Sequence, residues 1–254
     1  MRKADCTFTA TYWDWSLDSR EPFSTGPDNV WNKDTGFGGN GVDTDQNCVL
    51  DGPFRKGAWS RVRPDNPPPG PDCLTRSFSG TAPAEADVME VLNFDDFTMF
   101  EFGLRSTLHD NVHCQIGATM CTREAASAPE FFLHHSFIDK LWDDWQKKSM
   151  AHKYAYFPMV QEDMPGTDLR PARLIDLSNQ PGGVSVEYEP FKPEEEIRAN
   201  LAGLSPSQLR LSPRRPFTGL SQQAIRLFKI SAADVKEIRV LEKWLNPNVI
   251  EPKN

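Results

Sequence analysis

The histidines are distributed very unevenly along this sequence. Of the five histidines, only His152 lies outside the stretch LHDNVHCQIGATMCTREAASAPEFFLHHSFIDKLWDDWQ, and the other four are His109, His113, His134 and His135. Neutral imidazole is the commonest metal ligand among protein side chains. This clustering therefore makes metal binding the first chemistry to consider.

The spacing of these histidines indicates how two helices could present them. His109 and His113 are four residues apart, so on a helix they project from one face and can hold one ion. After His134 and His135, apolar residues recur at helical spacing: Ile138, Leu141, Trp142 and Trp145. Neighbouring helical residues point about 100° apart, so only one of His134 and His135 should face the metal. On spacing alone, an HxxxH pair is also compatible with two partly exposed neighbours.

Several motifs together resemble a known family. HxxxH, IGATM and SAPEFFLHHSFIDKLW are similar to the second copper-binding half of the type 3 copper proteins, which are the tyrosinases, catechol oxidases and molluscan hemocyanins. TYWDWSLDS, GFGGNG, LDGPF and CLTRSF precede them in the family's order, so the resemblance covers about the first 150 residues. The segments SAPEFFLHH and IDKLWDDWQ are most similar to those of the tyrosinase-like proteins of invertebrate animals.

The resemblance implies a set of copper ligands and a reaction. The family's ligands correspond to His109, His113 and His135, which leaves His134 as a neighbour. The intact family site holds two copper ions and uses O2 to oxidise phenols and o-diphenols to o-quinones. A phenolic small molecule and O2 are therefore the expected partners.

Two acidic residues are candidates for catalysis by the same resemblance. In tyrosinases an acidic residue, matched by Glu101, and an Asn directly after the first histidine orient a water that deprotonates the phenol. Here Asp110 stands in place of that Asn. An ionised carboxylate accepts hydrogen bonds but cannot donate one, so monophenol hydroxylation is in greater doubt than diphenol oxidation. The alternative for Glu101 is an ordinary charge on a helix surface.

The histidine count limits what this chain can assemble. In the family, YWDW follows a first copper half with three further histidines, whereas here Met1 lies just before it. We therefore expect a fragment, a mis-started gene model or a protein that lost one copper site. Only His134 and His152 remain for a second site, so we expect one copper ion and a chain not competent alone. The alternatives are a hemocyanin-like oxygen binder and a catalytically inactive copper-binding or interaction protein.

The five cysteines leave one unpaired and show no CxxC spacing. Cys114 and Cys121 flank the turn between the two histidine motifs, where they either form a disulfide or remain buried thiols. Disulfides would imply an oxidising compartment. We expect an extracellular protein if the full-length chain carries a signal peptide.

The remaining pattern predicts a mainly α fold in which part of a copper-binding helical bundle is surrounded by long irregular loops. Residues 20–80 are rich in Gly, Pro, Asp and Asn, and GFGGNG is predicted to be a structural turn rather than a phosphate loop. Helical spacing predicts one or two helices between residues 84 and 108. We predict a tyrosinase-like central domain over 1–157 and a C-terminal extension with short helices over 158–254, the clearest at 231–245.

Length and charge exclude some classes of function. A chain of 254 residues can bury one sizeable core. The net charge of −8 argues against a nucleic-acid partner and an anionic membrane surface. No apolar run approaches the 18 residues of a membrane-spanning helix.

Overall fold

The computed structural model describes residues 11–27, 29–61, 70–158 and 160–189, together with residues 232, 235, 236 and 239. The chain divides into two compact units, Met1–Tyr188 and Glu189–Asn254. The predicted boundary after residue 157 falls inside the first unit and stays a prediction. The predicted helix over 231–245 lies mostly outside the described residues, and the four described there are helical.

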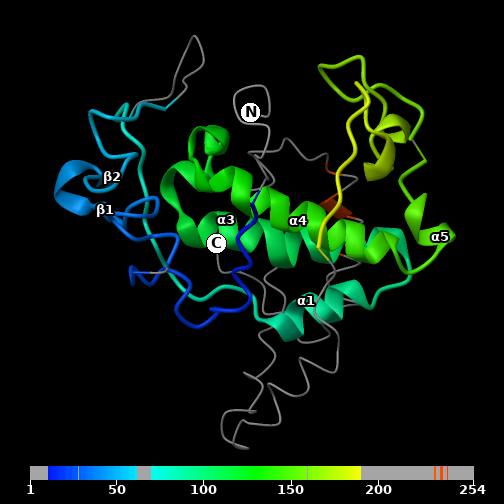
Figure 1. The fold of residues 1–254 in the computed structure, drawn as a ribbon, viewed down its shortest axis with the longest axis horizontal. Coiled ribbons are helices and arrows are strands. Elements are labelled where there is room, and N and C mark those ends of the chain that lie inside the picture. Colours follow the sequence, from blue (N-terminus) through cyan, green and yellow to red (C-terminus); the bar gives the residue numbers. More distant parts are fainter. Residues whose placement is uncertain are drawn as a thin grey trace, which may run out of the picture. The chain divides into compact units, whose positions relative to one another are not determined.

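The first unit is rich in helices, as the sequence predicts, and has one small antiparallel sheet (Figure 1). Its strands and α-helices are β1 (Gly41–Val42), β2 (Cys48–Val49), α1 (Glu85–Leu92), α2 (Phe97–Phe102), α3 (Asp110–Ile116), α4 (Glu130–Gln146) and α5 (Met150–Lys153). Its π-helix is η2 (Gly103–His109), and its 3-10 helices are η1 (Asp43–Asp45), η3 (Ala118–Cys121), η4 (Ala125–Ser127), η5 (Pro171–Arg173) and η6 (Leu177–Asn179).

Among the described residues, helix α4 is the longest element, and it carries two of the histidines. Phe137, Leu141 and Trp145 follow one another at intervals of four, so they form one face, and all three are fully buried. The indole of Trp145 stacks on Phe100 of α2 with 4.4 Å between ring centroids. In Figure 1, α4 crosses the middle of the unit with α1 packed against it. The apolar face of α4 is thus the centre of the core.

The other two histidines lie on a continuous helical segment made of α2, η2 and α3. Asp96 caps its start by accepting a hydrogen bond from the Met99 backbone N–H at 3.0 Å. In its middle the N–H of Asp110 donates to the carbonyl of Arg105, five residues back, which is the π-helical pattern. Single π-turns of this kind often occur at functional sites, and this one ends at His109.

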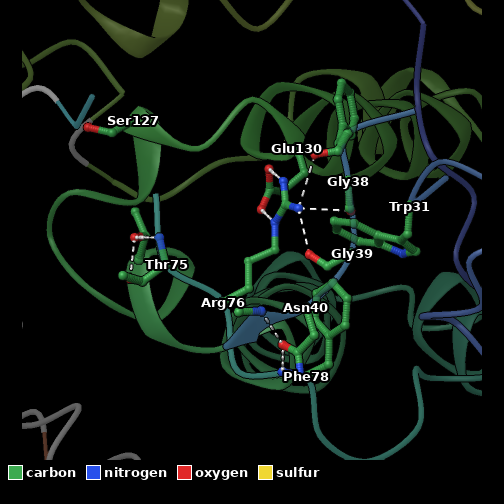
Figure 2. A network of polar contacts seen from close by, with 12 residues as sticks. Trp31, Gly38, Gly39, Asn40, Thr75, Arg76, Phe78, Ser127 and Glu130 are labelled. Atoms are coloured by element: carbon green, nitrogen blue, oxygen red, sulfur yellow. Dashed lines mark hydrogen bonds and ion pairs between the residues drawn. The ribbon is translucent and has the colours of Figure 1, made fainter. Parts of the chain in front are cut away.

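A buried ion pair fixes the first turn of α4, as Figure 2 shows. The Arg76 guanidinium donates to both carboxylate oxygens of Glu130, from Nε at 2.8 Å and from Nη2 at 3.0 Å. Arg76 is 0% and Glu130 1% exposed, and the guanidinium lies over the Trp31 ring at 5.0 Å. Bidentate pairing of this kind has a fixed geometry. It therefore attaches the start of α4 to the segment that carries Arg76.

The same arginine organises the glycine-rich loop. Its Nη1 donates to the backbone carbonyls of Phe37, Gly38 and Gly39, at 2.9 to 3.1 Å. The carbonyls of this loop therefore accept hydrogen bonds from the buried Arg76 guanidinium, so the loop has a structural role. A disulfide between Cys48 and Cys73 further links this region.

Among the residues that the structure describes, no helix has the length and apolarity needed to span a bilayer.

Candidate metal centre

Three of the four clustered histidines direct their Nε2 atoms toward one another. The Nε2 of His135 on α4 lies 3.3 Å from that of His109 and 3.1 Å from that of His113. Nitrogens bound to one ion at about 2.0–2.1 Å with near-tetrahedral angles lie about 3.3 Å apart. The two separations from His135 thus match those around one ion.

Two hydrogen bonds set which ring nitrogen of each helical histidine is free. His113 Nδ1 lies 2.6 Å from the Met120 carbonyl, and His109 Nδ1 lies 2.7 Å from Asp110 Oδ1. A carbonyl or an ionised carboxylate can only accept, so each Nδ1 carries the proton and each Nε2 keeps its lone pair. This pairing of a ligand's second nitrogen with an oxygen is usual in metal sites.

The IGATM motif places the Met120 carbonyl where His113 needs it. Gly117 ends α3 with φ of +69°, and a Cβ there would lie 2.7 Å from the Ser77 carbonyl oxygen. Only glycine therefore fits this turn. A disulfide between Cys114 and Cys121 closes the same turn, which decides between the two alternatives that the sequence left open.

The adjacent pair on α4 has two different environments. The His135 ring is half-buried and stacks on Phe131 with 3.9 Å between centroids. His134 is fully buried, and its Nδ1 accepts a hydrogen bond from Trp15 Nε1 at 3.1 Å. Both rings belong to one cluster with His109 and His113 (centroid distances 4.8 to 5.3 Å).

A second set of three histidines also has to be considered. Ligand atoms of His109, His113 and His134 all lie within 4.8 Å of one another. We favour the set with His135 because its Nε2 separations of 3.1 and 3.3 Å already match those around one ion. The His134 Nδ1 is in addition engaged by Trp15.

Burial keeps these imidazoles neutral. Burial, followed by the neighbouring His109, lowers the pKa of His113 from 6.5 to about 4. The same two causes and His113 lower the pKa of His135 to about 3. Burial, followed by the neighbouring histidines, also holds the pKa of His134 well below its usual value. Neutral imidazole is the form that binds metal, so the cluster is ready to bind at neutral pH.

Comparison with known proteins identifies the family. The family profile described as "Common central domain of tyrosinase" matches residues 1–148. The chain belongs to the tyrosinase family. A tyrosinase of Streptomyces lincolnensis is 33% identical over 202 residues, which covers 69% of this chain and 70% of that protein. A tyrosinase of Streptomyces glaucescens is 34% identical over 203 residues, with the same coverage. The tyrosinase-like protein phomQ1 of Diaporthe leptostromiformis is 32% identical over 183 residues, 63% of this chain and 45% of that protein.

The tyrosinase family consists of copper proteins, so copper is the metal against which the site must be tested. Three neutral imidazoles with converging lone pairs suit copper among the first-row metals. The residues present therefore fit a copper ion, with His109, His113 and His135 as the candidate ligands.

The structure places the two acidic candidates of the tyrosinase family differently. Asp110 contacts the cluster directly, through its hydrogen bond with His109. Glu101 lies on α2 and forms an ion pair with Arg105 one turn later, at 2.6 Å. Its charge also contributes, after burial, to the raised pKa of Tyr156. The sequence had not indicated that Glu101 shares its carboxylate with an arginine.

Other contributors to the site could not be found from sequence. Met120 acts through its backbone carbonyl, so its side-chain type carries no signal. The YWDW motif indicated the family but not the Trp15–His134 hydrogen bond. Asp139, one turn after His135, accepts a hydrogen bond from the Tyr188 hydroxyl at 2.7 Å.

Proposed function

We propose that this protein binds copper through His109, His113 and His135 and takes part in the oxidation of o-diphenols to o-quinones by O2. The observation that carries the proposal is the convergence of three Nε2 atoms at 3.1 and 3.3 Å. From its own histidines this chain supplies ligands for one copper ion. Membership of the tyrosinase family supports the phenolic substrate class.

Each residue of the site has a role that follows from its contacts. Copper, when bound, supplies the one-electron chemistry that connects O2 with a phenol. The Met120 carbonyl and the Asp110 carboxylate hold the rings of His113 and His109 in one tautomer. Phe131 fixes the plane of His135 by stacking. These contacts spare the site any rearrangement when the metal binds.

The histidines of the site differ in exposure. His113 is 8% exposed, whereas the His109 side chain is 24% exposed. In our proposal the phenol approaches from the side of His109, and in an oxygen carrier that side would be closed to phenols.

Asp110 bears on the type of phenol oxidised. Its Oδ1 accepts a hydrogen bond from His109, and an ionised carboxylate has no N–H with which to donate to a water. We infer that diphenol oxidation exceeds monophenol hydroxylation. Asp110→Asn keeps an oxygen for His109 and adds an N–H donor, so it should raise the ratio of monophenol to diphenol turnover. An unchanged or lower ratio would contradict this role.

Metal analysis with a diphenol oxidation assay tests the main proposal. We expect His113→Asn to lose most of the bound copper, because it removes a buried ligand. His152→Asn is the matched control, since His152 lies outside the cluster and should leave copper unchanged. Copper with reversible O2 binding and no turnover would favour an oxygen carrier. Failure of the wild-type chain to bind copper would refute the proposal.

We further propose that the protein works in an extracellular or otherwise oxidising compartment. The disulfides Cys48–Cys73 and Cys114–Cys121 support this, because such bonds persist outside the reducing cytosol. Thiol alkylation of the native protein followed by mass spectrometry tests it. We expect these four cysteines to be protected, and free thiols at both pairs would contradict it.

A further inference from the structure

His134 and His135 are placed almost equally with respect to the other two histidines. The His134 ring centroid lies 4.8 Å from His113 and 5.3 Å from His109. The His135 ring centroid lies 5.3 Å from His113 and 4.9 Å from His109. Ring-centroid distances alone therefore do not distinguish the two adjacent residues.

The two rings differ in what contacts their nitrogens. The indole N–H of Trp15 donates to Nδ1 of His134 at 3.1 Å. A neutral imidazole that accepts at Nδ1 carries its proton on Nε2. A protonated nitrogen has no lone pair in the ring plane and cannot bind a metal. In this tautomer, neither nitrogen of His134 is free to coordinate copper.

In this tautomer the Nε2 of His134 carries a proton and is not available as a ligand. His134 is fully buried, and among the described residues no side chain forms a hydrogen bond with its Nε2. If the Trp15 bond were lost, the proton could move to Nδ1. One ring nitrogen of His134 lies within 4.8 Å of ligand atoms of His109 and His113, so a lone pair freed on His134 would be within reach of the same site.

Trp15 is itself held rigidly enough to impose this choice. It is fully buried and packs edge-on against Phe137 of α4 with 5.0 Å between centroids. Two residues earlier, the Trp13 backbone N–H donates to the Leu133 carbonyl at 3.2 Å, which fastens this segment to α4 directly before the histidine pair. The indole N–H thus has a fixed direction relative to His134.

We propose that Trp15 is a positioning residue that selects His135 as the third copper ligand by locking His134 in the tautomer that cannot coordinate. This inference rests on the proposed copper site. It assigns to the YWDW motif a role in metal chemistry in addition to packing.

A double-mutant experiment with copper affinity as the readout tests the proposal. In the otherwise unchanged protein, His135→Asn should weaken copper binding by at least about 10- to 100-fold, the range seen even for changes outside the ligand shell. In the Trp15→Phe background, His134 can replace the lost ligand. The same substitution should then cost at least about fivefold less, as expected for coupled residues.

Trp145→Phe is the matched control. Trp145 is also fully buried, and its Nε1 donates to the Phe94 carbonyl at 2.6 Å, so the substitution removes a comparable hydrogen bond. In that background the cost of His135→Asn should be unchanged. Electron paramagnetic resonance of the Cu(II) protein should show a second species in Trp15→Phe alone, and adding His134→Asn should remove it.

A measurement on the unmutated chain keeps the proposal testable if the Trp15 variant does not fold. Long-range 1H–15N NMR of the metal-free protein reports the tautomer of each histidine, and it should find the His134 proton on Nε2. A proton on Nδ1, or equal costs of His135→Asn with and without Trp15, would overturn the inference. Full copper affinity in the single His135→Asn variant would instead overturn the ligand set itself.

Discussion

Removal of Glu130 should destabilise the protein more than removal of any exposed carboxylate. The Arg76–Glu130 pair is almost inaccessible to water, with side chains 0% and 1% exposed, and it is bidentate (Figure 2). Breaking such a pair leaves an uncompensated buried charge and typically costs about 3–5 kcal/mol. The three loop carbonyls that contact Arg76 carry only partial charges, so they do not replace the carboxylate.

The expected loss of stability can be expressed as a decrease in melting temperature. For a domain of this size, about 1 kcal/mol corresponds to about 2–4 °C. Glu130→Ala should therefore lower the midpoint by about 6–20 °C, measured by calorimetry at pH 7. Glu130→Gln keeps the shape and one acceptor, so its decrease should be smaller.

The matched control is an ion pair of similar length at the surface. Lys56 and Asp45 lie 2.6 Å apart with side chains 51% and 34% exposed. Exposed pairs contribute up to about 1 kcal/mol, so Asp45→Ala should change the midpoint by a few degrees at most. Should Glu130→Ala cost no more than this control, our account of the pair would be wrong. Because Glu130 begins the helix that carries His135, we also expect weaker copper binding.

Three further predictions concern pH, backbone conformation and cross-linking. The pKa of His113 is lowered to about 4 in the folded protein, so below pH 6.5 the unfolded chain binds more protons. The stability that the neutral His113 contributes to the metal-free protein should be fully present above pH 6.5 and fall toward pH 4, by up to about 1.4 kcal/mol per pH unit. The free energy of unfolding, measured by urea titration at each pH, should therefore fall less steeply with decreasing pH in His113→Asn. Gly117→Ala should unfold more easily and bind copper more weakly than Gly57→Ala: both glycines have positive φ, but a Cβ meets the Ser77 carbonyl only at Gly117, and equal effects would argue against the turn's role. Removal of the Cys48–Cys73 disulfide, which joins residues 25 apart, should cost about 3.5 kcal/mol by the loop-entropy relation, and denaturation of the Cys48→Ser, Cys73→Ser double variant measures it.

Much of the candidate site could be predicted because its information is local. The interval of four between His109 and His113 determines that they share a face of any helix that contains them. The apolar residues of α4 likewise determine which side of that helix faces the core. The order of the motifs then indicated the family, which the family profile confirmed.

The contacts that complete the site are not local. Arg76 and Glu130 are 54 residues apart, and Trp15 and His134 are 119 apart. No periodicity relates such positions, and Glu130 in particular would have been read as one more charge on a helix. Their pairing follows from how loop and helix pack around a shared core.

By itself, the sequence determined that four imidazoles lie on two helices and that the protein is mainly helical, because helix geometry converts spacing into direction. Only the tertiary structure decided which nitrogen of each ring is free, because that choice depends on a carbonyl from Met120, a carboxylate from Asp110 and an indole from Trp15. A hydrogen bond depends on the positions of two atoms in the folded protein, and the spacing of residues along the chain does not specify those positions.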